Sequence, residues 1–158
     1  MPITTRLATP SDARAIHDLI QLYVPSGELL PRSDEFVALR AHEFLVAERD
    51  GQVVGCAHLD EYAPSLAELR SLAVSPDAQG QGVGIALVAG IERLAARRGF
   101  TTLFAVSNSA AFFAKLGYEE RDVPELNRER SEVSRWKAVH VKDLQASATV
   151  PASEVRAR

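Results

Sequence analysis

The chain contains a glycine-rich stretch whose spacing suits the binding of a phosphate group. Gly80, Gly82 and Gly84 stand at every second position, directly before an apolar segment that is predicted to be a helix. Glycine permits positive φ and lets a ligand approach the backbone without meeting a Cβ. Because the loop runs straight into a helix, its N–H groups and the positive end of the helix dipole face one spot. The stretch therefore predicts a site for a phosphate-bearing ligand.

Three phosphate-binding motifs and a ligand-free turn compete for this stretch. A P-loop is excluded, because neither Lys nor Ser/Thr follows Gly84. A dinucleotide loop needs Gly-x-Gly-x-x-Gly and an acidic residue closing the next strand, whereas residues 101–106 lead into Ser-Asn. The acyl-CoA loop Gln/Arg-x-x-Gly-x-Gly/Ala is matched at each position by Gln79, Gly80, Gln81, Gly82, Val83 and Gly84. On the loop alone, an acyl-CoA site and a glycine turn both remain open.

The composition is that of an ordinary globular domain. The chain has 158 residues, 46% hydrophobic and 25% charged, and a formal net charge of −3, which gives no basic field for nucleic acid. A single cysteine excludes an internal disulfide and suits a reducing compartment. No signal-peptide core or membrane-spanning run is present. We expect one soluble, cytoplasmic domain over residues 1–144, followed by a disordered tail over residues 145–158, with no nucleic-acid or membrane partner.

The elements that must position the loop are predicted from apolar periodicity and turn signals. Strands are expected at Ile3–Leu7, Phe44–Glu48, Gln52–Leu59, Leu66–Val74, Phe100–Val106, Tyr118–Val123 and Val133–Val141. Helices are expected after Thr9, from Ser33 or Asp34 to about His42, from the glycine loop to Gly99, and around Phe112 and Phe113. The order β-α-α-β-β-β-α-β-α-β-β predicts an α/β fold with a mixed sheet and helices on both faces.

The chain resembles the GNAT superfamily of acetyl-CoA-dependent N-acetyltransferases in three features. These are the order of elements, a Gln-x-x-Gly-x-Gly loop after Leu-Ala-Val-Ser-Pro, and a later Phe-Phe-Ala-Lys-Leu-Gly-Tyr segment. The resemblance runs from Ile3 to Leu144 and implies a mostly antiparallel central sheet. Within the superfamily the chain resembles the N-acetylglutamate synthases, amino-acid acetyltransferases of arginine biosynthesis. The residues that carry this are Gly27–Ser33, with its Leu-Leu-Pro-Arg-Ser turn, Phe44–Glu48, Asp50–Ala57 and Ala67–Val74.

The resemblance implies a binding site for acetyl-CoA. The loop from Gln79 to Gly84 would hold the pyrophosphate, and the backbone of Leu72, Ala73 and Val74 would line the pantetheine arm. Asn108 and Phe113 are assigned to the coenzyme, and Phe113 stands where the family often has a general-acid Tyr. Because a thiol titrates near pH 8.5, the leaving group needs little help from an acid.

Glu68 is the predicted general base. It lies in a strand too apolar for a solvent-exposed carboxylate, burial would raise its pKa, and the family keeps an acidic residue here. The structural alternative is an ion pair with Arg70, which shares its face of the strand.

The predicted acceptor site depends on arginine, which pairs with carboxylates through two parallel hydrogen bonds. Its residues are Leu30, Arg32, Arg70, Ser107, Arg135 and Lys137; Lys137 stands where the family has Ser. Ser107 and Asn108 have helix capping as their alternative role. No metal site is expected, because His17, His42, His58 and His140 lack a metal-ligand spacing, and Cys56 is expected to be a buried strand residue.

The sequence thus predicts transfer of acetyl from acetyl-CoA to the α-amine of a small amino acid, with glutamate as the specific candidate. Two alternatives stay open: acetylation of another small amine or protein amine, and a catalytically weak acyl-CoA-binding module. The oligomeric state is not predicted, and a homodimer remains compatible with the sequence.

Overall fold

The computed structural model describes residues 2–126 and 137–144. The predicted tail over residues 145–158, Arg135, and the first residues of the predicted strand from Val133 lie outside the described residues. Contacts divide the chain into two compact units, Met1–Asp60 with Leu69–Arg93 and Glu61–Glu68 with Leu94–Arg158.

Seven strands form one mixed sheet in the hydrogen-bonded order β1-β2-β3-β4-β5-β7-β6. The strands are β1 (Thr4–Leu7), β2 (Phe44–Arg49), β3 (Gln52–Ala63), β4 (Leu66–Val74), β5 (Thr102–Ser107), β6 (Glu119–Glu120) and β7 (Ala138–Asp143). Strands β4 and β5 pair in parallel, with Leu66–Glu68 opposite Thr102–Phe104. The pairs β1–β2, β2–β3, β5–β7 and β6–β7 are antiparallel. The predicted fold class and element order are confirmed.

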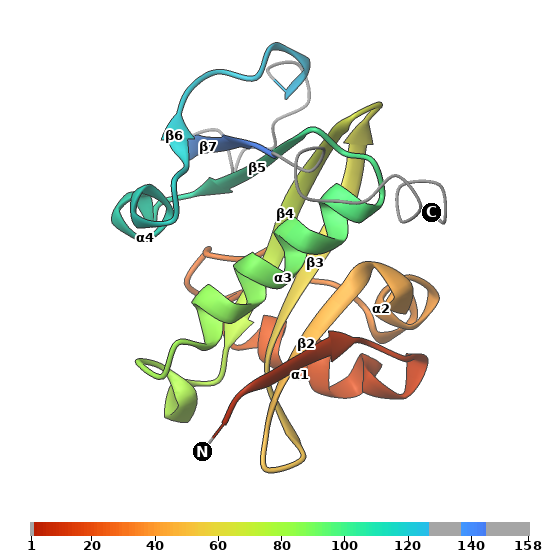
Figure 1. Ribbon diagram of the computed structural model, residues 1–158. Helices are drawn as coiled ribbons and strands as arrows, with labels where there is room; N and C mark the ends of the chain where they lie inside the picture. Colours follow the sequence, from red (N-terminus) through yellow and green to blue (C-terminus); the bar gives the residue numbers. More distant parts are fainter. Residues whose placement is uncertain (1, 127–136, 145–158) are drawn as a thin grey trace. The chain divides into compact units, whose positions relative to one another are not determined.

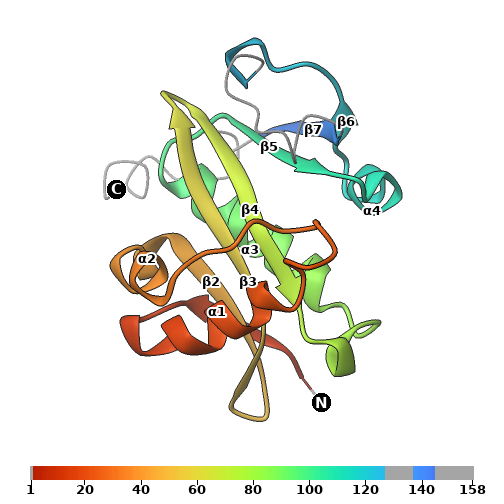
Figure 2. The same ribbon diagram turned by 180° about the vertical axis from the view of Figure 1, so that it is seen from behind.

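In the first unit, helices cover both faces of the strands (Figures 1 and 2). The helices are α1 (Ala13–Gln21), α2 (Asp34–Leu39) and α3 (Val83–Arg97). Ile16, Ile20 and Val37 from α1 and α2 share a buried cluster with Phe44, Val46, Cys56 and Ala73 of the strands. On the opposite face α3 lies so close that a Cβ added at Gly55 would be 2.8 Å from Val83 Cγ1, and one at Gly90 would be 2.7 Å from Leu45 Cδ1.

The β2–β3 hairpin forms as its turn residues predict. Asp50 and Gly51 both have positive φ, 55° and 77°, as a type I′ turn requires. Val53, opposite Glu48, follows a register shift next to Ala47. The hairpin places Arg49 and Gln52 at its tip and carries β3 on to His58 and Asp60.

In the second unit, helix α4 (Ala110–Lys115) follows β5, and Gly117 ends it with φ 91°. Leu66, Phe104, Val123, Leu126, Val139 and Val141 form its apolar cluster. Phe113 of α4 stacks on His140, with ring centroids 5.2 Å apart, and meets Tyr118 edge to face.

Several predicted boundaries were wrong. Strand β3 ends at Ala63, past the predicted end at Leu59, and β5 begins at Thr102 rather than Phe100. The second helix ends at Leu39 rather than near His42, because Arg40 has φ −113° and residues 41–43 continue as a 3₁₀ turn. The strand predicted over Tyr118–Val123 is reduced to Glu119–Glu120, since Val123 and Leu126 turn inward to the apolar cluster. The described part of the last strand runs to Asp143, past the predicted end at Val141.

Candidate active site

The glycine loop has the backbone that its sequence predicts. Gly80 and Gly82 have φ of 79° and 83°, and a Cβ added at either would meet nothing within 4 Å. Glycine is therefore needed here for backbone conformation and for open space above the chain, not for tight packing. Helix α3 begins at Val83, and the first N–H groups of a helix have no intrahelical acceptor. The loop and helix start offer donors that suit a phosphate group.

A tyrosine that the sequence analysis missed joins this loop to β4. The Tyr23 hydroxyl donates to the carbonyl oxygen of Val74, and it accepts from Gln79 Nε2 at 2.9 Å. Val74 belongs to the predicted pantetheine segment and Gln79 to the predicted pyrophosphate loop. The hydroxyl therefore fixes the position of one segment against the other.

An arginine also borders the loop. Arg49 Nη1 donates to Gln81 Oε1 at 3.0 Å, and Nη2 pairs with Asp77 Oδ2 at 3.3 Å. The Ser75 hydroxyl donates to Asp77 Oδ1, and this hydrogen bond, ahead of Arg49, lowers the pKa of the Asp77 carboxyl. The side chains of Gln79 and Gln81 are thus held by Tyr23 and Arg49, so the fold anchors both glutamines of the motif.

Strand β4 changes its backbone conformation at Ser71. Ser71 has φ 53° although it is not glycine, which costs about 1 kcal/mol, and it is buried. Its carbonyl accepts from Cys56 Sγ at 3.4 Å. Backbone strain of this kind is found at binding and catalytic sites. Leu72 and Val74 are half-buried and Ala73 is buried, as expected where only the backbone of Leu72 and Val74 serves a ligand.

Arg32 lies in a turn that several contacts hold in place. His17 Nδ1 is 2.8 Å from the Arg32 carbonyl oxygen, which accepts from it, and Ser33 caps α2 by accepting from Phe36 N–H. The guanidinium lies over the Phe36 ring, with Cζ 5.3 Å from the centroid. A cation held by a short, capped turn can meet an anionic ligand with little loss of side-chain entropy. Leu30 of the same turn is half-buried.

Arg70, the second predicted acceptor arginine of this unit, pairs with a carboxylate. Its Nη1 donates to Asp60 Oδ2 at 3.2 Å, and both side chains are about one-third exposed, 29% and 31%. The sequence alternative placed Glu68 against Arg70 and did not anticipate Asp60.

The second unit contains the other predicted residues. Glu68 is half-buried and lies opposite Phe104 in the β4–β5 register. The Ser107 hydroxyl accepts from Ser109 N–H at 2.9 Å, and its carbonyl accepts from His140 Nε2 at 3.0 Å. This contact lies before α4, whose N-cap is Ser109, so Ser107 does not cap the helix and its role at the acceptor site stays a prediction.

The remaining second-unit residues differ in exposure. Asn108 is exposed and Lys137 is half-buried. Phe113 is only 3% exposed, because it is enclosed by Tyr118 and His140. Its side chain therefore belongs to the core, and its assignment to the coenzyme stays a prediction.

Comparison with known proteins gives the family. The model of the acetyltransferase (GNAT) domain matches residues 40–120. An uncharacterized N-acetyltransferase of Chlorobaculum tepidum is 36% identical over 115 residues, 73% of this chain and 74% of that protein. The amino-acid acetyltransferase of Pasteurella multocida is 31% identical over 147 residues, 90% of this chain and 33% of that protein.

The same similarity appears among solved structures. N-acetylglutamate synthase from Neisseria gonorrhoeae, complexed with coenzyme A and N-acetyl-glutamate, superposes with a TM-score of 0.83 at 34% identity. That match covers 92% of this chain and 36% of the synthase. The chain thus spans about a third of the length of the amino-acid acetyltransferase and of the synthase.

The chain belongs to the GNAT acetyltransferase family. This confirms the predicted resemblance to the family. It also confirms the predicted enzyme class, an acetyl-CoA-dependent N-acetyltransferase, and acetyl-CoA as the acetyl donor. Among the described residues, no helix is long and apolar enough to cross a membrane.

Proposed function

We propose that this enzyme acetylates the α-amine of a small amino acid, with glutamate as the preferred acceptor. The observation that carries the proposal is Arg32, a cation fixed by a capped turn and an aromatic ring within the Leu-Leu-Pro-Arg-Ser segment. Similarity to amino-acid acetyltransferases over 90% of the chain supports the same acceptor class. The single free cysteine suits a cytoplasmic location.

The proposed roles follow the chemistry of the transfer. Gln79–Gly84 and the backbone of Leu72–Val74 bind the donor, and Arg32 and Arg70 hold acceptor carboxylates. Glu68, directly or through a water, takes the proton that the ammonium group must lose before it can attack. The amine nitrogen then forms a bond to the thioester carbon and the carbon–sulfur bond breaks. The second proton that the nitrogen loses goes to the departing thiolate or to solvent.

The acceptor is tested by measuring thiol release from acetyl-CoA with each amino acid in turn. We expect the highest kcat/KM with glutamate, and lower values with glutamine, alanine and lysine. Arg32→Met should raise the KM for glutamate by about tenfold to a hundredfold, the loss typical of a charged hydrogen bond. Arg14→Met is the matched control, because Arg14 is 75% exposed and pairs only weakly with Asp18 and Asp34.

Two outcomes would overturn the proposal. Equal kcat/KM for acidic, neutral and basic acceptors would remove the amino-acid preference. Acetyl-CoA binding by calorimetry without turnover on any acceptor would favour the binding module instead.

A further inference from the structure

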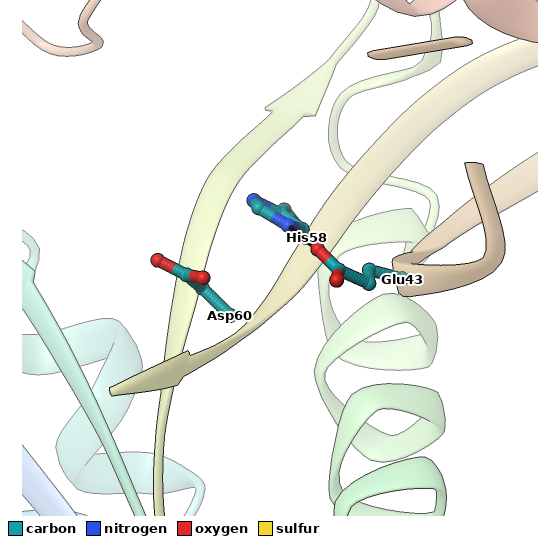
Figure 3. Close-up of side chains that lie close together, drawn as sticks. All are labelled: Glu43, His58 and Asp60. Carbon is teal, nitrogen blue, oxygen red and sulfur yellow. Dashed lines mark hydrogen bonds and ion pairs between the residues drawn. The ribbon is translucent and has the colours of Figure 1, made fainter. Parts of the chain in front are cut away.

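Three side chains outside the predicted acetyl-transfer chemistry meet in the first unit. Glu43, His58 and Asp60 each offer one ligand atom, and these atoms lie within 4.8 Å of one another. His58 and Asp60 are two residues apart on β3 and therefore share a face of the strand. Glu43 comes from the turn that precedes β2. Figure 3 shows the imidazole between the two carboxylate groups.

The imidazole has an unused ligand atom. His58 is 1% exposed, stacked on Phe44 with ring centroids 4.2 Å apart and met edge to face by Phe36. Its Nε2 donates to Glu43 Oε1 at 2.8 Å, whereas its buried Nδ1 has no hydrogen-bond partner. A buried polar atom without a partner is uncommon and asks for an explanation. Burial lowers the pKa of His58 and outweighs the opposite effect of its hydrogen bond to Glu43.

We propose that Glu43, His58 and Asp60 bind a divalent transition-metal ion, with Zn²⁺ the best match. One imidazole and two carboxylates are a ligand set that Zn²⁺ accepts, and three protein ligands leave a position for water. In a tetrahedral site with ligand atoms about 2.1 Å from the ion, those atoms lie about 3.4 Å apart. The ligand atoms of this cluster lie within 4.8 Å of one another, so the widest pair must approach by at most about 1.4 Å. Glu43 and Asp60 are 28% and 31% exposed, which gives the ion a path from solvent.

The neighbouring Arg70 affects the affinity of this site for a metal ion. Arg70 pairs with Asp60 at 3.2 Å and competes with a cation for that carboxylate. Removing the guanidinium should therefore tighten metal binding, whereas removing a ligand should weaken it. A merely structural hydrogen-bonded cluster has no reason to show these opposite responses.

The test is calorimetric titration of the chelator-treated full chain with Zn²⁺, repeated with Co²⁺ followed by visible absorption. We expect one ion per chain, and Co²⁺ bands that Zn²⁺ displaces. Asp60→Asn should weaken binding at least tenfold, and Arg70→Gln should strengthen it severalfold. His42→Gln is the matched control, since this exposed histidine flanks Glu43 at 3.7 Å and should not change affinity.

His58→Leu should abolish binding, and its near-ultraviolet circular dichroism shows whether it is folded. If this variant does not fold, the ¹⁵N chemical shifts of the His58 ring are measured in the wild-type protein instead. Coordination of Zn²⁺ should move one of the two nitrogen resonances. Absence of binding, an unmoved His58 resonance, or affinity that is unchanged in Asp60→Asn would each overturn the proposal. All three readouts are independent of acetyl transfer.

Discussion

At the scale of single residues, Glu68 is the most exacting prediction. The sequence assigned it as the base from the apolar strand around it and from the family resemblance, and the structure finds it half-buried on β4. The assignment is tested by kinetics.

Glu68→Gln should lower kcat by about a hundredfold to ten-thousandfold, because the amide keeps the shape but cannot take a proton. The measurement is the steady-state rate with saturating acetyl-CoA from pH 6 to 9. Loss of the low-pH limb of the wild-type profile is expected in the variant. Glu61→Gln is the control, an exposed glutamate of the same unit. A kcat within about twofold of wild type would remove Glu68 from the mechanism.

Residue types and local spacing predicted the backbone of the glycine loop and the hairpin turn, because each depends on a few neighbouring positions. Contacts between distant segments were not predicted. Tyr23 lies 56 residues from Gln79, and Arg49 lies 32 from Gln81. His58 and Asp60 could have been placed on one face by their spacing alone, but Glu43 joins them only through the turn before β2.

At the scale of elements, α3 and its loop use glycine for two different reasons. Gly82 has positive φ and open space around it, whereas Gly55 has α3 directly above it. Substitution by alanine at each position therefore separates the need for positive φ at Gly82 from the need for space beside Gly55.

Gly82→Ala should raise the KM for acetyl-CoA severalfold with a small loss of stability, because an L-residue at φ 83° is strained by about 1–2 kcal/mol. Gly55→Ala should instead lower stability by about 1–3 kcal/mol, since its Cβ would lie 2.9 Å from Leu87 Cδ1 and 3.3 Å from the Ala73 carbonyl oxygen. Thermal unfolding and acetyl-CoA titration of both variants give the comparison. An unchanged KM in Gly82→Ala would indicate that the loop does not hold the donor.

Element boundaries were predicted best where a turn residue enforces them. Strand β4 was predicted from Leu66 to Val74, as observed, because Ser65, with φ 64°, and Ser75-Pro76 enclose it. The length of β6 depends instead on the packing of Val123 and Leu126, which no local pattern displays.

At the scale of the whole molecule, the single cysteine reports on opening of the first unit. Cys56 is fully buried, and burial raises its pKa to about 12, while a hydrogen bond with the backbone of Ala73 acts in the opposite direction. An unfolded thiol titrates near pH 8.5. Labelling between pH 7 and 9 therefore requires opening.

In native buffer, a thiol reagent should modify Cys56 at least about a thousandfold more slowly than in urea, in line with ordinary protein stability. From pH 7 to 9 the rate should rise with ionisation of the exposed thiol, not of the native one. Following both rates by absorbance checks this. Equal rates in buffer and urea would contradict the buried position of Cys56.

The hydroxyl of Tyr23 has one further consequence. The hydroxyl donates its proton to the Val74 carbonyl and accepts a hydrogen bond from the Gln79 amide through a lone pair. The two hydrogen bonds therefore run in one direction, from the amide through the phenol to the carbonyl. A phenylalanine at position 23 would leave both neighbours without their partner at once. Evolution should therefore change positions 23 and 79 together, and homologues that lack the phenol should carry a residue other than glutamine at the start of the loop.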